Sequence, residues 1–156
     1  MRILTLAVVV TACGGGGQSP PGDGALNDGV PGDGAFKCAD DSALEPNDSL
    51  QTAFVVPPGS TTFAGLSICP QSDLDLYRID VATANTTLEI LTEAETDVPL
   101  SLSILNAGGS ALANGVPGGT RMVRAAVPNL PVGSFFARVS SSAGQNNYKI
   151  TVNLTP

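Results

Sequence analysis

The chain has 156 residues and a formal net charge of −7, with only seven Lys and Arg residues. This length suits one folded domain, and so few basic residues exclude the clustered positive surface that nucleic-acid binding requires. The sequence contains no histidine, so the commonest general base and the commonest transition-metal ligand are both missing. These totals argue against a nucleic-acid partner and against histidine-based catalysis.

The first residues of the chain have the pattern of an export signal. Arg2 is followed by the apolar run Ile3–Val10 and then by small residues, a run far shorter than the roughly 20 residues that span a bilayer. The stretch VTAC, which ends at Cys13, resembles the lipobox of bacterial lipoproteins. The resemblance implies that residues 1–12 are a lipoprotein signal peptide, and that Cys13 receives fatty acyl chains such as palmitate on its sulfur and nitrogen. The alternative is an ordinary signal peptide with a cysteine near its cleavage point.

Residues 13–37 comprise this cysteine and a Gly- and Pro-rich stretch in which PGDGA occurs twice. A segment with so few apolar side chains cannot bury enough surface to offset the entropy lost on ordering. We therefore predict a lipidated cysteine followed by a flexible tether.

If Cys13 carries lipid, the remaining cysteines are Cys38 and Cys69. An exported chain meets oxidising conditions, in which paired cysteines form disulfides. A bond between these two would stabilise the fold by on the order of 3–4 kcal/mol on the chain-entropy model. We predict this disulfide, and the alternative is two buried free thiols.

From residue 38 onward, apolar and polar side chains alternate with the period of a β-strand. Turn signals rich in Gly, Pro and Asn separate the alternating runs. Strands are expected at residues 61–68, 76–81, 88–90, 100–104, 121–127, 135–139 and 148–154. About seven or eight short antiparallel strands with this spacing predict an all-β sandwich over residues 38–156.

Several motifs occur in order along this part of the chain. They are EPNDS at 45–49, DLDLY at 73–77, an aliphatic strand with an NAGG turn at 102–109, GSFFARV at 133–139 and YKITV at 148–152. Together they resemble the bacterial pre-peptidase C-terminal (PPC) domain over about residues 40–154. The resemblance implies a jelly-roll-like β-sandwich of a family usually appended to secreted proteases and other exported enzymes.

Carboxylates are concentrated in two short stretches of this weakly charged chain. Glu45, Asn47 and Asp48 lie close together, and Asp73 and Asp75 share one face at the entrance to a predicted strand. Calcium takes six to eight oxygen ligands from such groups, and the expected disulfide would draw the two stretches together. In the alternative interpretation, these side chains only form turns and keep a strand edge soluble.

A second resemblance bears on the same residues. The collagen-binding domains of clostridial collagenases are similar to the PPC family, and their corresponding segments hold calcium. This similarity implies a Ca²⁺ site formed by Glu45, Asn47, Asp48, Asp73 and Asp75.

The sequence does not predict an enzyme. A Ser–His relay is impossible without histidine, and Asp73 with Asp75 would need a sugar-sized cleft to act as a glycosidase pair. We therefore predict a non-catalytic binding module in the cell envelope, lipid-anchored at Cys13, which recognises an envelope or extracellular protein or a polysaccharide. In a diderm cell, Gly14 after the cysteine favours the outer membrane. The alternative function is a structural or accessory lipoprotein that assists a partner protein.

Overall fold

The structure is a computed structural model that describes residues 36–156. The expected signal peptide (1–12), Cys13 and all but the end of the expected tether (13–37) lie outside the described residues. The described part consists of strands and turns, and it contains no helix long and apolar enough to cross a membrane.

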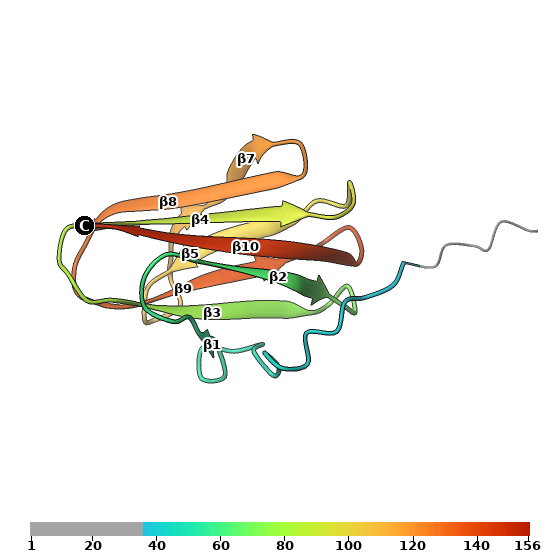
Figure 1. Ribbon diagram of the computed structural model, residues 1–156, viewed down its shortest axis with the longest axis horizontal. Coiled ribbons are helices and arrows are strands. Elements are labelled where there is room, and N and C mark those ends of the chain that lie inside the picture. The colour runs from blue at the N-terminus through green and yellow to red at the C-terminus, as the bar shows by residue number, and fades with distance from the viewer. Residues whose placement is uncertain (1–35) are drawn as a thin grey trace, which may run out of the picture. The chain divides into compact units, whose positions relative to one another are not determined.

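Within residues 36–156, ten strands form two five-stranded sheets (Figure 1). The strands of the first sheet are, in spatial order, β1 (Phe54–Val55), β3 (Leu74–Val81), β9 (Gly133–Ser140), β5 (Ser101–Leu105) and β6 (Ala111–Asn114). The strands of the second sheet are β2 (Thr61–Ile68), β10 (Asn146–Thr155), β4 (Thr86–Ala94), β8 (Met122–Leu130) and β7 (Val116–Gly119).

The connectivity is that of a jelly roll. Most connections cross between the sheets, including those from β2 to β3, β3 to β4, β4 to β5, β8 to β9 and β9 to β10. The orders β3-β9-β5-β6 and β2-β10-β4-β8 are the two four-stranded halves of this topology, and β1 and β7 are additions at their edges. The predicted all-β, jelly-roll-like sandwich is therefore confirmed.

Two details of the predicted sandwich were wrong. The expected seven or eight strands omit β1, β6 and β7, which have two to four residues each and are too short to show alternation. The strands are also not all antiparallel, because β1 pairs with β3 in parallel, with Phe54 opposite Tyr77.

The core lies between the sheets and follows the alternation of the sequence. Every second residue of β4 is buried, from Thr86 to Ala94, and Tyr77, Ile79 and Val81 of β3 face the same interior. Full burial of an aliphatic or aromatic side chain contributes roughly 1.5–3 kcal/mol relative to an exposed one. This core fixes which faces of the strands carry the site residues.

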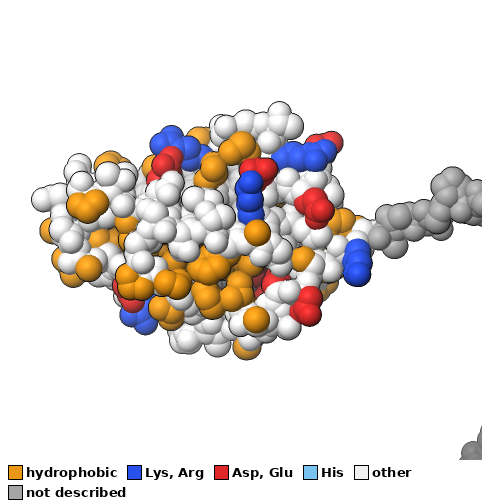
Figure 2. All heavy atoms as spheres, viewed as in Figure 1, with side chains coloured by type: hydrophobic (Ala, Val, Ile, Leu, Met, Phe, Trp, Pro, Cys, Tyr) orange, Lys and Arg blue, Asp and Glu red, His pale blue; other side chains and the backbone are white. Residues whose placement is uncertain are grey.

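The edges of the two sheets meet on the side where β1 and β2 lie. Phe54 of β1 and Phe63 of β2 pack edge to face with ring centroids 5.4 Å apart. Figure 2 shows apolar side chains gathered over this part of the surface, where β2 and β3 lie in Figure 1. The aromatic pair thus joins the sheets at their edge.

Residues 44–53, which we call the strap, cover part of the outer face of the first sheet. Leu50 and Ala53 pack there against a separate buried cluster of Leu76, Leu105 and Phe136. The chain just before the strap is bound to the end of β2, because Cys38 and Cys69 form a disulfide with a sequence separation of 31. The predicted disulfide is therefore present, and it brings the strap to the beginning of β3.

Candidate metal site

Glu45, Asp73 and Asp75 come together where the strap meets the beginning of β3. Glu45 belongs to the strap, Asp73 to the turn before β3, and Asp75 to β3 itself. One carboxylate oxygen of each lies within 4.8 Å of the other two. Two oxygens bound to one calcium ion are at most about 5 Å apart, because each Ca–O bond is about 2.3–2.6 Å long. The spacing of this acidic cluster therefore suits a single cation.

Asn47 supplies a further oxygen beside the acidic cluster. Its N–H donates to Glu45 Oε2 (2.9 Å) and its carbonyl accepts from the N–H of Leu76 (3.0 Å), so its backbone links the strap to β3. Asn47 is 1% exposed and Asp75 is 0% exposed, yet Oδ1 of each has no hydrogen-bond partner among the described residues. Buried oxygens without a donor are costly, and a bound cation would satisfy both.

Burial raises the pKa of all three carboxyl groups in the cluster. It raises the pKa of Asp75 to about 8, and the charges of Asp73 and Glu45 add to this increase. Burial is also the main reason why the pKa values of Glu45 and Asp73 lie above their usual range. None of the ion pairs found in residues 36–156 includes these three groups. The cluster therefore lacks a positive partner, which a cation would supply.

Two buried tyrosines hold the Asp75 carboxylate from the core side. The hydroxyl of Tyr148 donates to Asp75 Oδ2, and the hydroxyls of Tyr77 and Tyr148 lie 2.7 Å apart. Because Tyr148 uses its single proton on Asp75, Tyr77 donates to Tyr148. The sequence indicated only a core role for both tyrosines, whereas the structure shows that they also orient a residue of the acidic cluster.

In the second acidic stretch, Asp73 also stabilises the turn before β3. Asp73 Oδ2 accepts from the N–H of Cys69 and Oδ1 accepts from the N–H of Leu74, each at 3.0 Å. Asp48 is exposed and is not one of the three grouped carboxylates. It lies beside them, since it lines a pocket together with Asp73. The structure thus brings Glu45, Asp73 and Asp75 together, with Asn47 adjacent and Asp48 at the margin.

Asp41 is an acidic residue near the site that the sequence pattern did not single out. Its Oδ2 accepts from the N–H of Ser67 at 2.7 Å, and its charge contributes to the raised pKa values of Glu45, Asp73 and Asp75. The sequence feature that could have pointed to Asp41 as a site residue is its position shortly after a cysteine of the predicted disulfide.

The fold and the site together define a jelly-roll β-sandwich with an acidic cluster suited to a metal ion. Solved structures that share this fold include the following two. One is the pre-peptidase C-terminal domain of a collagenase from Bacillus anthracis, with a TM-score of 0.51 and 20% identity over 62% of this chain and 90% of that one. The other is PliG of Aeromonas hydrophila, a periplasmic lysozyme inhibitor of g-type lysozyme, with a TM-score of 0.50 and 14% identity over 65% of this chain and 94% of that one. No protein-family model and no curated protein matches the sequence.

Proposed function

We propose that this protein is a non-catalytic binding module of the cell envelope, stabilised by Ca²⁺ and anchored by lipid at Cys13. The observation that carries the proposal is the acidic cluster, in which buried oxygens without a hydrogen-bond partner accompany carboxylates that form no ion pair within residues 36–156. The two structures with the same fold support a binding role, since one is part of a collagenase and the other is a lysozyme inhibitor. The ligand in this proposal is an envelope or extracellular protein or a polysaccharide.

Glu45, Asp73 and Asp75 would hold the cation through carboxylate oxygens, and Asn47 would contribute its side-chain carbonyl. Oxygen donors of this kind suit Ca²⁺, which accepts irregular geometry and leaves positions for backbone oxygens and water. The exposed carboxylate of Asp48 would add negative charge at the margin of the site. The bound ion would offset the charge of the cluster and thereby fasten the strap to β3.

The location in the envelope has one structural support. The Cys38–Cys69 disulfide suits an oxidising compartment. Lipidation of Cys13, and the outer membrane in a diderm host, belong to the proposal because these residues lie outside the described part.

Replacing Cys13 by Ser is expected to abolish lipidation and to shift the protein from the membrane fraction to a soluble or uncleaved form. In this proposal the sulfur atom of Cys13 accepts the diacylglyceryl group, and the hydroxyl of serine cannot take its place. Incorporation of labelled palmitate and partition between detergent and water measure the result, with Gly14→Ser as the control that keeps the cysteine. A Cys13→Ser variant that stays in the membrane fraction at the wild-type level would refute the anchor.

Retention experiments with the immobilised chain test the binding role. Envelope and matrix fractions are passed over it in Ca²⁺ and then eluted. Saturable retention of a defined polysaccharide or matrix component supports the binding module. Saturable, reversible retention of an envelope or extracellular protein supports it as well, whereas one envelope protein that stays with the chain through elution at fixed stoichiometry supports the accessory lipoprotein. The absence of saturable retention contradicts both.

A further inference from the structure

A pocket of about 310 Å³ opens between the β4–β5 loop and the β7–β8 hairpin. Its wall is largely apolar and includes Val98, Leu100, Pro117, Met122 and Val123. None of its lining residues belongs to the acidic cluster. Ligand pockets are typically concave, mostly apolar and roughly 300–1,000 Å³ in volume, so this pocket is large enough for one bulky side chain and small for a whole ligand molecule.

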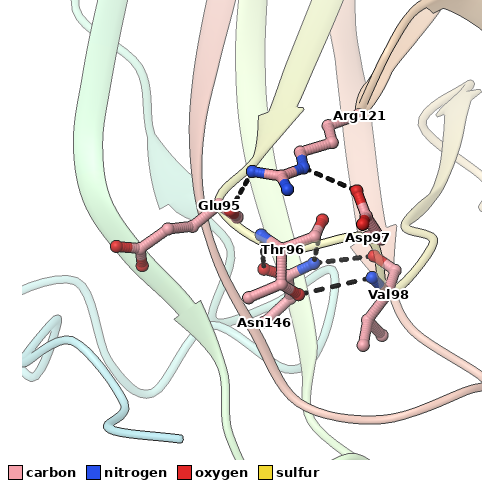
Figure 3. A network of polar contacts seen from close by, with 6 residues as sticks. All are labelled: Glu95, Thr96, Asp97, Val98, Arg121 and Asn146. Carbon is pink, nitrogen blue, oxygen red and sulfur yellow. Dashed lines mark hydrogen bonds and ion pairs between the residues drawn. The ribbon is translucent and has the colours of Figure 1, made fainter.

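The loop that forms one wall of the pocket is held by a buried side chain. Asn146 is 0% exposed. Its Oδ1 accepts from the N–H of Thr96 (3.1 Å), and its Nδ2 donates to the carbonyl of Val98 (2.6 Å). Figure 3 shows Asn146 directed into the turn of this loop. A wall that is already fixed needs little ordering when a partner binds, which favours affinity.

The rim of the pocket carries negative charge that remains accessible. Arg121 directs two of its five N–H donors to the loop: Nε donates to Asp97 Oδ1 and Nη1 donates to the carbonyl of Glu95, each at 2.7 Å (Figure 3). The Asp97 side chain is still 85% exposed, whereas the Glu95 side chain points away from Asp97 (Figure 3) and accepts a hydrogen bond from Asn147. Of the two charged residues that line the pocket, Arg121 is engaged by the loop, and the exposed carboxylate of Asp97 can still accept a hydrogen bond from a partner's cation.

We propose that this pocket receives a large apolar or aromatic side chain from an extended segment of a partner protein. A Lys or Arg next to that side chain pairs with Asp97. An apolar floor with a charged rim is the usual anatomy of a protein interface around an anchor residue. Val116, beside Pro117 on β7, is 58% exposed, so the apolar surface continues beyond the pocket, as a protein segment requires.

The proposal for this pocket rests on the proposed binding function, and it specifies that the ligand is a protein. It depends on neither the cation nor the lipid anchor. Its test is therefore separable from theirs.

The test is a methyl-NMR titration of the full chain labelled at its methionine methyl groups, since Met122 lines the pocket and the only other methionine is Met1. The probe is the capped peptide Gly-Lys-Phe-Lys-Gly. We expect a saturable shift of the Met122 methyl signal, and at least tenfold weaker binding when Ala replaces the phenylalanine or Glu replaces both lysines. Asp97→Asn is expected to weaken the lysine peptide several-fold, whereas Asp80→Asn, which breaks the exposed ion pair with Arg78, leaves binding unchanged.

Three results would overturn the assignment. They are the absence of a Met122 shift at millimolar peptide, equal shifts with all three peptides, and binding of benzyl alcohol as tight as that of the phenylalanine peptide. If any of these occurs while an envelope ligand still binds wild type and Asp97→Asn equally, the binding function stands and only the pocket assignment fails.

Discussion

Millimolar Ca²⁺ is expected to raise the melting temperature of the metal-free protein by roughly 10 °C, and a chelator is expected to reverse the change. A ligand that binds only the folded form stabilises it by RT ln(1 + [L]/Kd), which is about 2.7 kcal/mol at a hundredfold excess over Kd. A domain of this size gains roughly 4 °C per kcal/mol. Circular dichroism or calorimetric melts in Ca²⁺ and in chelator measure the shift.

Two matched variants and a second ion make this experiment specific. Asp75→Asn should remove most of the shift while keeping the hydrogen bond from Tyr148, because an amide oxygen still accepts it. Asp97→Asn removes a carboxylate outside the acidic cluster and should leave the shift intact. Mg²⁺ should stabilise less than Ca²⁺, because it demands octahedral geometry and loses its water reluctantly. Identical melts in Ca²⁺ and in chelator would exclude the site.

In chelator, the free energy of unfolding is expected to fall by several kcal/mol as pH rises from about 4 to about 8. Burial raises the pKa of Asp75 from 3.8 to about 8 in the folded state. The unfolded chain therefore loses this proton near pH 4, while the folded protein keeps it until about pH 8. The unfolded state is the more ionised one between these limits, so stability decreases with pH by up to about 1.4 kcal/mol per pH unit. Urea denaturation at intervals from pH 4 to 8 measures the slope.

The Asp75→Asn variant is the control for the pH experiment. It should flatten most of the slope, leaving the smaller contributions of Glu45 and Asp73, whose pKa values are shifted in the same direction. Saturating Ca²⁺ should also flatten the slope for wild type, because the ion favours the ionised carboxylates. The same slope in wild type and Asp75→Asn would show that Asp75 does not titrate as described.

The strands that could be predicted from the sequence are those long enough to show an alternation of apolar and polar side chains. The sequence indicated residues 88–90 as a strand, and the same alternation continues through all of β4, Thr86–Ala94. The parallel strand β1 has only Phe54 and Val55, and its pairing with β3 depends on the path of the strap. No local pattern can encode such a contact, because the pairing of two residues depends on neighbouring strands that are distant in the sequence.

The candidate site was predictable as a set of residue types and less so in its geometry. Glu45, Asp73 and Asp75 converge as expected because a disulfide joins the two stretches. The burial of Asp75 depends on Tyr148, which lies 73 positions later in the chain. The pocket wall likewise depends on Asn146, which contacts Thr96 across 50 positions. Partners so distant are found only once the strand order is known.

Direct calorimetric titration of Ca²⁺ into the metal-free chain at pH 8 is the most decisive measurement of the proposed cation site. The account predicts one ion per chain for wild type and for Asp97→Asn, and binding at least tenfold weaker for Asp75→Asn. The absence of binding to wild type, or equal binding to wild type and Asp75→Asn, would contradict it.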